Sequence, residues 1–121
     1  MQITKEELIN LLDSLNICVA EGINKDNHTN TFPRIVYWEY YWEFLQASSK
    51  TYNTLVTYQI SYFSKTPRDN NLLKLISALL NLGVVPDVSH EYIQEDKYFH
   101  SFFKIDVLEN VISFNEWFWW N

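Results

Sequence analysis

One cysteine and two of the histidines are the residues whose chemistry could support nucleophilic catalysis. Cys18 could act as a thiol nucleophile if folding brought it beside the imidazole of His90 or His100. However, Cys18 lies in the apolar run Ile17–Ala20, where a thiol usually serves packing rather than reaction. The sequence therefore favours a structural role for this cysteine.

A metal site could be assembled from the same histidines. His90 and His100 lie close in the sequence to Asp87 and Glu91, and the two arms of a hairpin could bring such ligands together. None of these residues has the spacing of a familiar metal motif, and histidines on an open hairpin are usually hydrated. We therefore expect neither a metal ion nor another cofactor.

Carboxylates and glycines add no stronger catalytic signal. Glu39 and Glu43 share one parity of a predicted strand, but paired carboxylates without a pocket are typical of the hydrated side of a sheet. The chain has two glycines, Gly22 and Gly83, and neither belongs to a phosphate-binding loop. The sequence thus predicts a protein that is not an enzyme.

Composition limits the remaining classes of function. The 121 residues are 47% hydrophobic, which suffices for one domain with a buried core. A formal net charge of −6 argues against a protein that grips nucleic-acid phosphates, and the aromatic run Tyr37–Phe44 lacks flanking basic residues. The single cysteine cannot form an internal disulfide, which predicts a reducing cytoplasm. The sequence contains no signal-type or membrane-spanning apolar run, so we expect a soluble protein that contacts no membrane.

The N-terminal segment carries a complete set of helix-start signals. Thr4 is the predicted cap, and Glu7 is placed to close a capping box. Ile3 and Leu8 occupy the positions of a hydrophobic staple. Leucines that recur on one face predict a helix from about Lys5 to Asn16.

Alternation predicts three strands in the next part of the chain. The run Ile17–Ala20 predicts a short strand, and the polar stretch 21–32 predicts a loop. After Pro33 the pattern predicts a long strand with one aromatic face, made of Val36, Trp38, Tyr40, Trp42 and Phe44. The alternating run Val56–Tyr62 predicts its antiparallel neighbour, reached through the small, polar connection 47–53.

A second helix is predicted over Pro67–Leu82. Thr66 is placed to cap it, Pro67 to take its first position, and Gly83 to end it in a left-handed conformation. Its leucines cover more than one stripe. We therefore expect this helix to pack on the sheet and also to touch something else, such as another subunit.

The last two predicted strands complete the fold class. The runs Val88–Ile93 and Tyr98–Leu108 flank a polar tetrad and predict a hairpin. The order α-β-β-β-α-β-β indicates an α+β fold: a mainly antiparallel sheet of about four to five strands with two helices packed on one face. We assign residues 1–108 to this domain and residues 109–121 to an aromatic C-terminal extension, which its own domain or a partner must cover.

Six segments of the chain, taken in order, resemble one known family. They are the N-terminal helix followed by Ile17–Gly22, the strand entry Phe32–Tyr37, the segment Tyr58–Asp69, the leucine-rich helix ending at Gly83, the segment His90–Tyr98 and the segment Phe102–Val107. Over about residues 5–108 the chain resembles the tail terminator, or tail completion, proteins of phages and prophages with long non-contractile tails. It departs from the family pattern in the connection 47–53 and in the tryptophan-rich extension.

This resemblance implies a structural function without catalysis. Such proteins form a ring, typically a hexamer, on the head-proximal end of the tail tube, stop tube polymerisation and dock onto the head connector. The implied partners are further copies of the chain, the tail tube protein and the connector or stopper protein. Genomic DNA would pass through the lumen without specific binding. The implied location is the virion, at the head–tail junction, after assembly in the host cytoplasm.

A ring of identical subunits needs two different adhesive surfaces on each subunit. We expect the leucine-rich helix and the aromatic extension to supply them, with candidate contacts Leu73, Leu80, Trp117, Phe118, Trp119 and Trp120. Because loops often carry recognition, we expect two polar loops to face the tube, the connector or the lumen. Their candidate residues are Asn24, Lys25, Asp26, Ser48, Ser49 and Lys50.

The alternative hypothesis is a small acidic protein that inhibits a nucleic-acid enzyme by mimicking DNA. Its carboxylates would stand in for phosphates. The acids of this chain never exceed two in a row, as in Glu6–Glu7 and Glu95–Asp96, whereas such mimics usually carry denser runs. A small-molecule enzyme is the third hypothesis, and it would need a pocket that gathers His90, His100 or Cys18.

Overall fold

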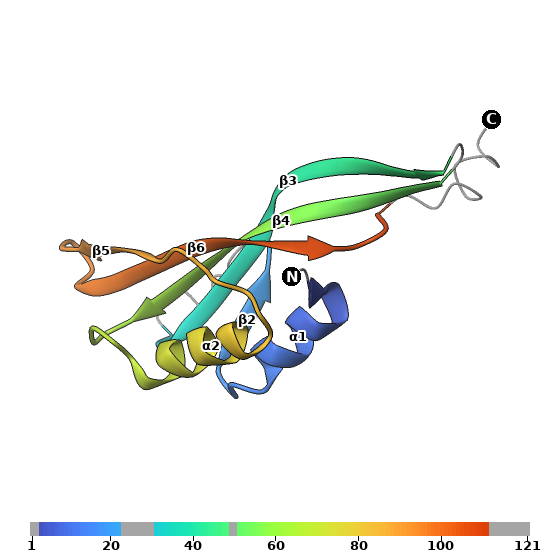
Figure 1. Cartoon of the computed structure of the whole chain (residues 1–121). Coiled ribbons are helices and arrows are strands. Elements are labelled where there is room, and N and C mark those ends of the chain that lie inside the picture. Colours follow the sequence, from blue (N-terminus) through green and yellow to red (C-terminus); the bar gives the residue numbers. More distant parts are fainter. Residues whose placement is uncertain (1–2, 23–30, 49–50, 112–121) are drawn as a thin grey trace.

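The structure, a computed structural model, describes residues 3–22, 31–48 and 51–111, and for residues 47, 48, 51 and 52 it describes the backbone alone. It is an α+β fold with two helices and a curled sheet of six strands (Figure 1). In chain order the elements are β1 (Ile3–Thr4), α1 (Lys5–Asp13), β2 (Cys18–Glu21), β3 (Arg34–Ser48), β4 (Thr51–Ser64), α2 (Asn70–Asn81), β5 (Ser89–Ile93) and β6 (Tyr98–Leu108).

The sheet is mixed and has six strands, so the expectation of a mainly antiparallel sheet of four to five strands is met only in part. The strand order is β1-β6-β4-β3-β2, and β5 also pairs with β6. The pairs β3–β4, β4–β6 and β5–β6 are antiparallel, whereas β1 is parallel to β6 and β2 is parallel to β3. A parallel neighbour needs a crossover of about a dozen residues. The chain between Glu21 and Arg34 is long enough to return β3 to the same end of the sheet as β2.

Helix α1 begins as the sequence predicts. The backbone N–H of Glu7 donates to Thr4 Oγ1 (3.1 Å), and the backbone N–H of Thr4 donates to Glu7 Oε1 (3.0 Å), which is the predicted capping box. The helix ends at Asp13 rather than at Asn16. Asn16 has a φ of 56°, a left-handed conformation that asparagine tolerates but that cannot continue a helix.

Helix α2 begins three residues later than predicted, with Asp69 instead of Thr66 as its cap. The Asp69 carboxylate accepts the backbone N–H of Asn71 at 3.0 Å, while Arg68 has a φ of 51° and lies outside the helix. The predicted end at Gly83 is confirmed, since its φ is 84°. There the N–H groups of Gly83 and Val84 donate to the carbonyls of Leu80 and Leu79, the two hydrogen bonds of a Schellman motif.

The single aromatic face predicted for the long strand is wrong, because β3 contains a bulge. Glu39 pairs with Tyr58 and Tyr41 pairs with Thr57, so Tyr40 is an extra residue in β3. One extra residue moves all later side chains to the opposite face. Trp38 therefore points to the open face of the sheet, whereas Trp42 points to the face that the helices cover.

The core lies between the two helices and one face of the sheet. Its fully buried side chains include Leu8, Leu12, Leu75 and Leu79 from the helices and Val56, Tyr58, Ile60, Tyr62 and Val107 from the strands. Beyond this core β3 and β4 continue as a two-stranded ribbon, at the upper right of Figure 1. After β6 the N–H of Glu109 donates to the carbonyl of Thr54 (3.0 Å), and Val111 packs against the core.

Candidate interaction surfaces

The first candidate surface is the ribbon that leaves the domain. We call it the arm and define it as Tyr40–Leu45 of β3 with Asn53–Leu55 of β4. Strand β2 pairs with β3 only as far as Tyr37, and β6 pairs with β4 only from Leu55 onward. Within the described residues, the β3 edge of the arm therefore lacks a neighbouring strand. On the β4 edge, Leu55 still pairs with Leu108 and the Thr54 carbonyl accepts the Glu109 N–H. An isolated two-stranded ribbon is at best marginally stable in water.

Large apolar side chains cover the arm. Five of them are between 41% and 59% exposed, namely Tyr40, Tyr41, Trp42, Phe44 and Leu45. With roughly 100 Å² each, since an aromatic side chain has about 150–250 Å² to bury, the arm exposes about 500 Å² of apolar surface. This surface is divided between the two faces of the ribbon, because Trp42 and Phe44 lie on one face and Tyr41 and Leu45 on the other. Exposed apolar side chains gathered on one element are typical of an interaction surface.

Charges on the arm are of one sign. Glu43 lies on the arm and Glu39 lies at its base, and among the described residues of the arm there is no cation. A cation from the domain touches the arm: the Nζ of Lys104 of β6 lies 3.7 Å from the centroid of the Tyr40 ring. This contact holds the bulge residue against the open face of the sheet. The remainder of the arm thus combines exposed aromatic rings with negative charge.

The second candidate surface is the outer side of α2. Leu73 and Leu80, which the sequence identifies as candidate contacts, are seven residues apart and therefore lie on the same side of the helix. Both are about half exposed. Lys74 is next to Leu73, and α2 contains no acidic residue. The outer side of α2 is therefore apolar with a positive charge, the opposite sign to the arm.

The other predicted contact residues lie outside the described part of the chain. These are Trp117, Phe118, Trp119 and Trp120 of the extension and Asn24, Lys25, Asp26, Ser49 and Lys50 of the loops. Ser48 is the last residue of β3, and only its backbone is described.

The possible nucleophile and its bases do not converge. Cys18 on β2 and His100 on β6 are separated by β3 and β4, a distance of about 14 Å at the usual strand spacing. His90 pairs with Ser101 and Glu91 pairs with His100, so the two histidines point to opposite faces. Their Nδ1 atoms lie 2.7 Å from Ser101 Oγ and 2.8 Å from Glu91 Oε1. The described residues contain no group of three potential metal ligands.

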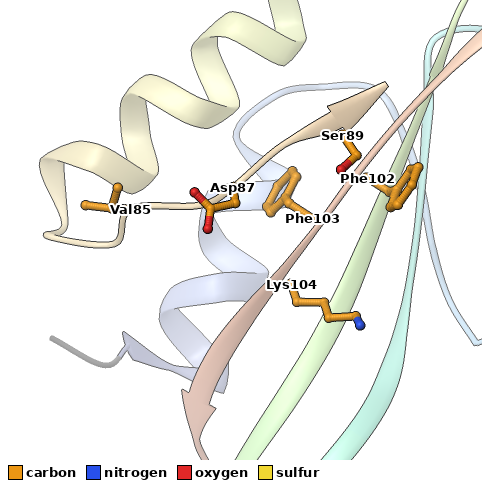
Figure 2. Close-up of a pocket in the computed structure, with 6 residues that line it drawn as sticks. All are labelled: Val85, Asp87, Ser89, Phe102, Phe103 and Lys104. Atoms are coloured by element: carbon orange, nitrogen blue, oxygen red, sulfur yellow. The ribbon is translucent and has the colours of Figure 1, made fainter. Parts of the chain in front are cut away.

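A hollow of about 350 Å³ opens at the edge of β6, between β5 and β1 (Figure 2). It is lined by Val85, Asp87, Ser89, Phe102, Phe103 and Lys104. Phe102 and Lys104 extend from one side of β6, whereas Phe103 extends from the other, beside Asp87 (Figure 2). The ammonium and the carboxylate therefore do not face a common point, and the hollow has no pair of groups poised for catalysis.

A network of polar side chains fixes the base of the arm. The Lys5 ammonium donates to the Tyr58 hydroxyl (2.7 Å) and to Glu21 (2.8 Å), while the Tyr58 hydroxyl donates to Glu109 (2.8 Å). The Tyr37 hydroxyl donates to the other Glu21 oxygen at 3.3 Å. Burial, reinforced by the Glu21 carboxylate, raises the pKa of Tyr37 to about 12, and burial raises that of Tyr58 as well. Both phenols therefore stay protonated at neutral pH and act as structural donors.

No model of a known protein family matches the chain, and no curated protein matches it significantly. The assignment of a function therefore depends on the surfaces described above and on the sequence motifs.

The buried basic residue Arg34 adds one argument about nucleic acids. Its guanidinium lies 4.2 Å from the Phe63 ring centroid and 4.8 Å from that of Phe32, with Tyr98 at 5.9 Å. Burial among these rings lowers the pKa of the guanidinium. Arg34 is thus a packed core cation that is not displayed to a phosphate backbone. No helix in the described ranges is long and apolar enough to span a membrane.

Sequence reasoning missed the arm as an exposed surface. It predicted one aromatic face for this strand without separating the rings that are buried from those that are exposed. One signal was present, because the predicted strand that contains Val36–Phe44 is longer than the mean strand of five to six residues. Where two paired strands are longer than the part of the sheet that the helices cover, the remainder of the pair is an exposed ribbon.

Proposed function

We propose that this protein is a structural subunit that forms a ring on the head-proximal end of a phage tail tube. The ring, with six subunits by analogy with the resembling family, ends tube polymerisation and provides the docking surface for the head connector. The observation that supports this proposal is the presence of two exposed apolar surfaces, the arm and the outer side of α2, far apart on one folded body (Figure 1).

Two different surfaces of this kind favour self-assembly. When unlike patches of identical subunits meet, the growing assembly keeps one free patch of each kind at its two ends, and it closes into a ring where the rotation between neighbours allows it. A catalytic protein would need converging reactive groups, and the described residues do not bring the sequence candidates Cys18, His90 and His100 together. The motifs shared with tail terminators over residues 5–108 favour a ring at the tube end over other rings.

The charge of the chain is compatible with a channel for DNA. The formal net charge is −6, and the cation Arg34 is buried among aromatic rings. A negative lumen repels the DNA backbone, so DNA can pass without being held. The proposed partners are the tail tube protein, the connector or stopper protein and further copies of the chain, within the virion at the head–tail junction.

The decisive experiment measures mass and tube-end binding together. Light scattering over a concentration series, with and without purified tail tubes, should show a sixfold mass or capture of the protein by the tubes. Electron microscopy should then place the protein at tube ends and not along tube sides, which serve as the internal control. A protein that stays monomeric at all concentrations and does not bind tail tubes would contradict the proposal. It would favour the alternative function, an acidic inhibitor of a nucleic-acid enzyme.

A further inference from the structure

We infer that the arm of one copy of this chain docks on the outer side of α2 of the next copy. This inference rests on the proposed function, because it names the contact by which the ring would assemble. The partner is a second copy of this chain, and the contact joins two different surfaces. Four observations on the described residues lead to it.

The first observation is a sheet face that is covered over only part of its length. Trp42 pairs with Val56 and Phe44 pairs with Thr54, and paired residues share a face, so both aromatic rings point to the side that carries α1 and α2. Their rings meet edge to face with centroids 6.1 Å apart. Within the domain, leucines of the two helices cover this face. On the arm, Trp42 and Phe44 of the same face are about half exposed, although Thr54 between β3 and β6 is buried.

The second observation is a helix with leucines on two sides. Leu72, Leu75 and Leu79 of α2 pack on the sheet of their own subunit, while Leu73 and Leu80 point outward. A helix that buries leucines on both sides lies between two layers, as helices in layered α and β folds do. The half-exposed face of a neighbouring arm would supply the second layer. The contact would therefore continue the helix-on-sheet packing of the domain into the next subunit.

The third observation is charge complementarity. Glu39 pairs with Tyr58 and so lies on the same face as Trp42 and Phe44. On the other surface, Lys74 lies beside Leu73 on a helix without acidic residues. An arm-to-helix contact places opposite charges together, whereas an arm-to-arm contact would bring like carboxylates together. The charges thus favour an unlike pair of surfaces over a symmetric dimer of arms.

The fourth observation concerns the kind of contact and its size. The bulge at Tyr40 and the exposed Glu39 and Glu43 are features that prevent a free strand edge from pairing with another strand. Side-chain packing on the arm's face is therefore favoured over addition of a strand. Trp42 and Phe44, the two rings on this face of the arm, expose roughly 200 Å² of apolar surface, about a quarter of the 800 Å² or so that each partner of a stable interface buries.

Cysteine cross-linking tests this contact directly. In a Cys18→Ser background, Gln46→Cys lies next to the arm and Ser77→Cys lies on α2; both positions are close to the apolar residues and leave them intact. Equal amounts of the two variants are mixed at concentrations, and with tail tubes, at which light scattering shows assembly, and a short bismaleimide is added. Gln94→Cys in the β5–β6 turn replaces Ser77→Cys in the matched control. We expect the linked dimer from Gln46→Cys with Ser77→Cys to exceed that of the control by at least about tenfold.

A charge exchange tests the same contact without a cross-linker. Glu39→Lys or Lys74→Glu alone should weaken assembly about tenfold, and the two changes in one chain should restore it, because the pair of charges is then reversed. Neither side chain is buried, so thermal melting should show that all three variants fold. Failure of the double variant to recover assembly would overturn the proposed orientation.

The outcomes separate this inference from the proposed function. Capture of sixfold rings at tube ends without arm-to-helix links would overturn the contact and leave the function standing. Arm-to-helix links in a protein that does not bind tail tubes would support the contact and overturn the proposed function. Links that appear only when residues 112–121 are deleted would show that this segment, instead of a second copy, covers the arm. A link within single chains of the doubly substituted protein at high dilution would also overturn the inference.

Discussion

Trp42 lies directly opposite Val56 in the β3–β4 pair and points to the same side of the sheet, yet Val56 is fully buried and Trp42 is 45% exposed. The pairing and the face are shared, so strand geometry does not explain the difference. The neighbours do: Val56 pairs on its other side with Val107 of β6 and belongs to the core cluster with the helix leucines, whereas β2 ends before it reaches Trp42. This boundary between covered and exposed sheet is the basis of the proposed interface.

Two phenylalanines on the same sheet face test this boundary. Phe103 of β6 is buried, whereas Phe44 of the arm is half exposed. Phe103→Ala should lower the free energy of unfolding by about 3–5 kcal/mol, since it leaves a core cavity. Phe44→Ala should change it by no more than about 0.5 kcal/mol while reducing assembly. Urea denaturation and light scattering on both variants check this, and a strongly destabilised Phe44→Ala would contradict the exposed position of the arm.

Removal of the α2 cap should be more costly than removal of the α1 cap. The Asp69 carboxylate accepts hydrogen bonds from both the Asn71 N–H and the buried Tyr62 hydroxyl. Asp69→Ala should therefore cost about 2–4 kcal/mol, the sum of a lost cap and an unpaired buried hydroxyl. Thr4→Ala, which removes only a cap, should cost about 1 kcal/mol. Equal losses in denaturant titrations would show that the Tyr62 hydrogen bond contributes nothing.

Stability should fall at alkaline pH because of Tyr37. Burial and the Glu21 carboxylate raise its pKa from 10.0 to about 12 in the folded protein. Below pH 10 both states keep the proton, and the contribution to stability is complete. Between pH 10 and about 12 only the unfolded state releases the proton, so unfolding becomes progressively easier. Denaturation midpoints across this range should drop, with a shallower drop for Tyr37→Phe; identical slopes would contradict the raised pKa.

Deletion of residues 112–121 tests the aromatic extension. The shortened chain keeps Glu109, which accepts the Tyr58 hydrogen bond, and Val111, which packs on the core. We therefore expect its thermal stability to be unchanged and its assembly or its solubility to decrease, as expected if the extension takes part in contacts. Light scattering with tail tubes is the measurement, and the full-length chain is the control. An unchanged ring would remove Trp117–Trp120 from the interface.

The sequence by itself determined the features that depend on neighbours along the chain. The capping box of Thr4 and Glu7, the terminator Gly83 and the hairpin of β5 and β6 are all local, since each satisfies hydrogen bonds within a few residues. Leu73 and Leu80 could likewise be placed on the outer side of a helix, because the period of the helix fixes its faces. The α+β class followed from the order of these elements.

Only the tertiary structure decided the features that depend on distant partners. The two-residue strand β1 exists because β6 accepts it as a neighbour, and the parallel pairing of β2 with β3 depends on where the chain returns. The bulge at Tyr40 reverses the faces of β3, and alternation alone cannot reveal an extra residue. The exposure of the arm depends on where the pairing of β2 with β3 and of β6 with β4 ends. Burial depends on tertiary packing. The pattern of apolar residues therefore identified the aromatic strand but not which part of it is exposed to solvent.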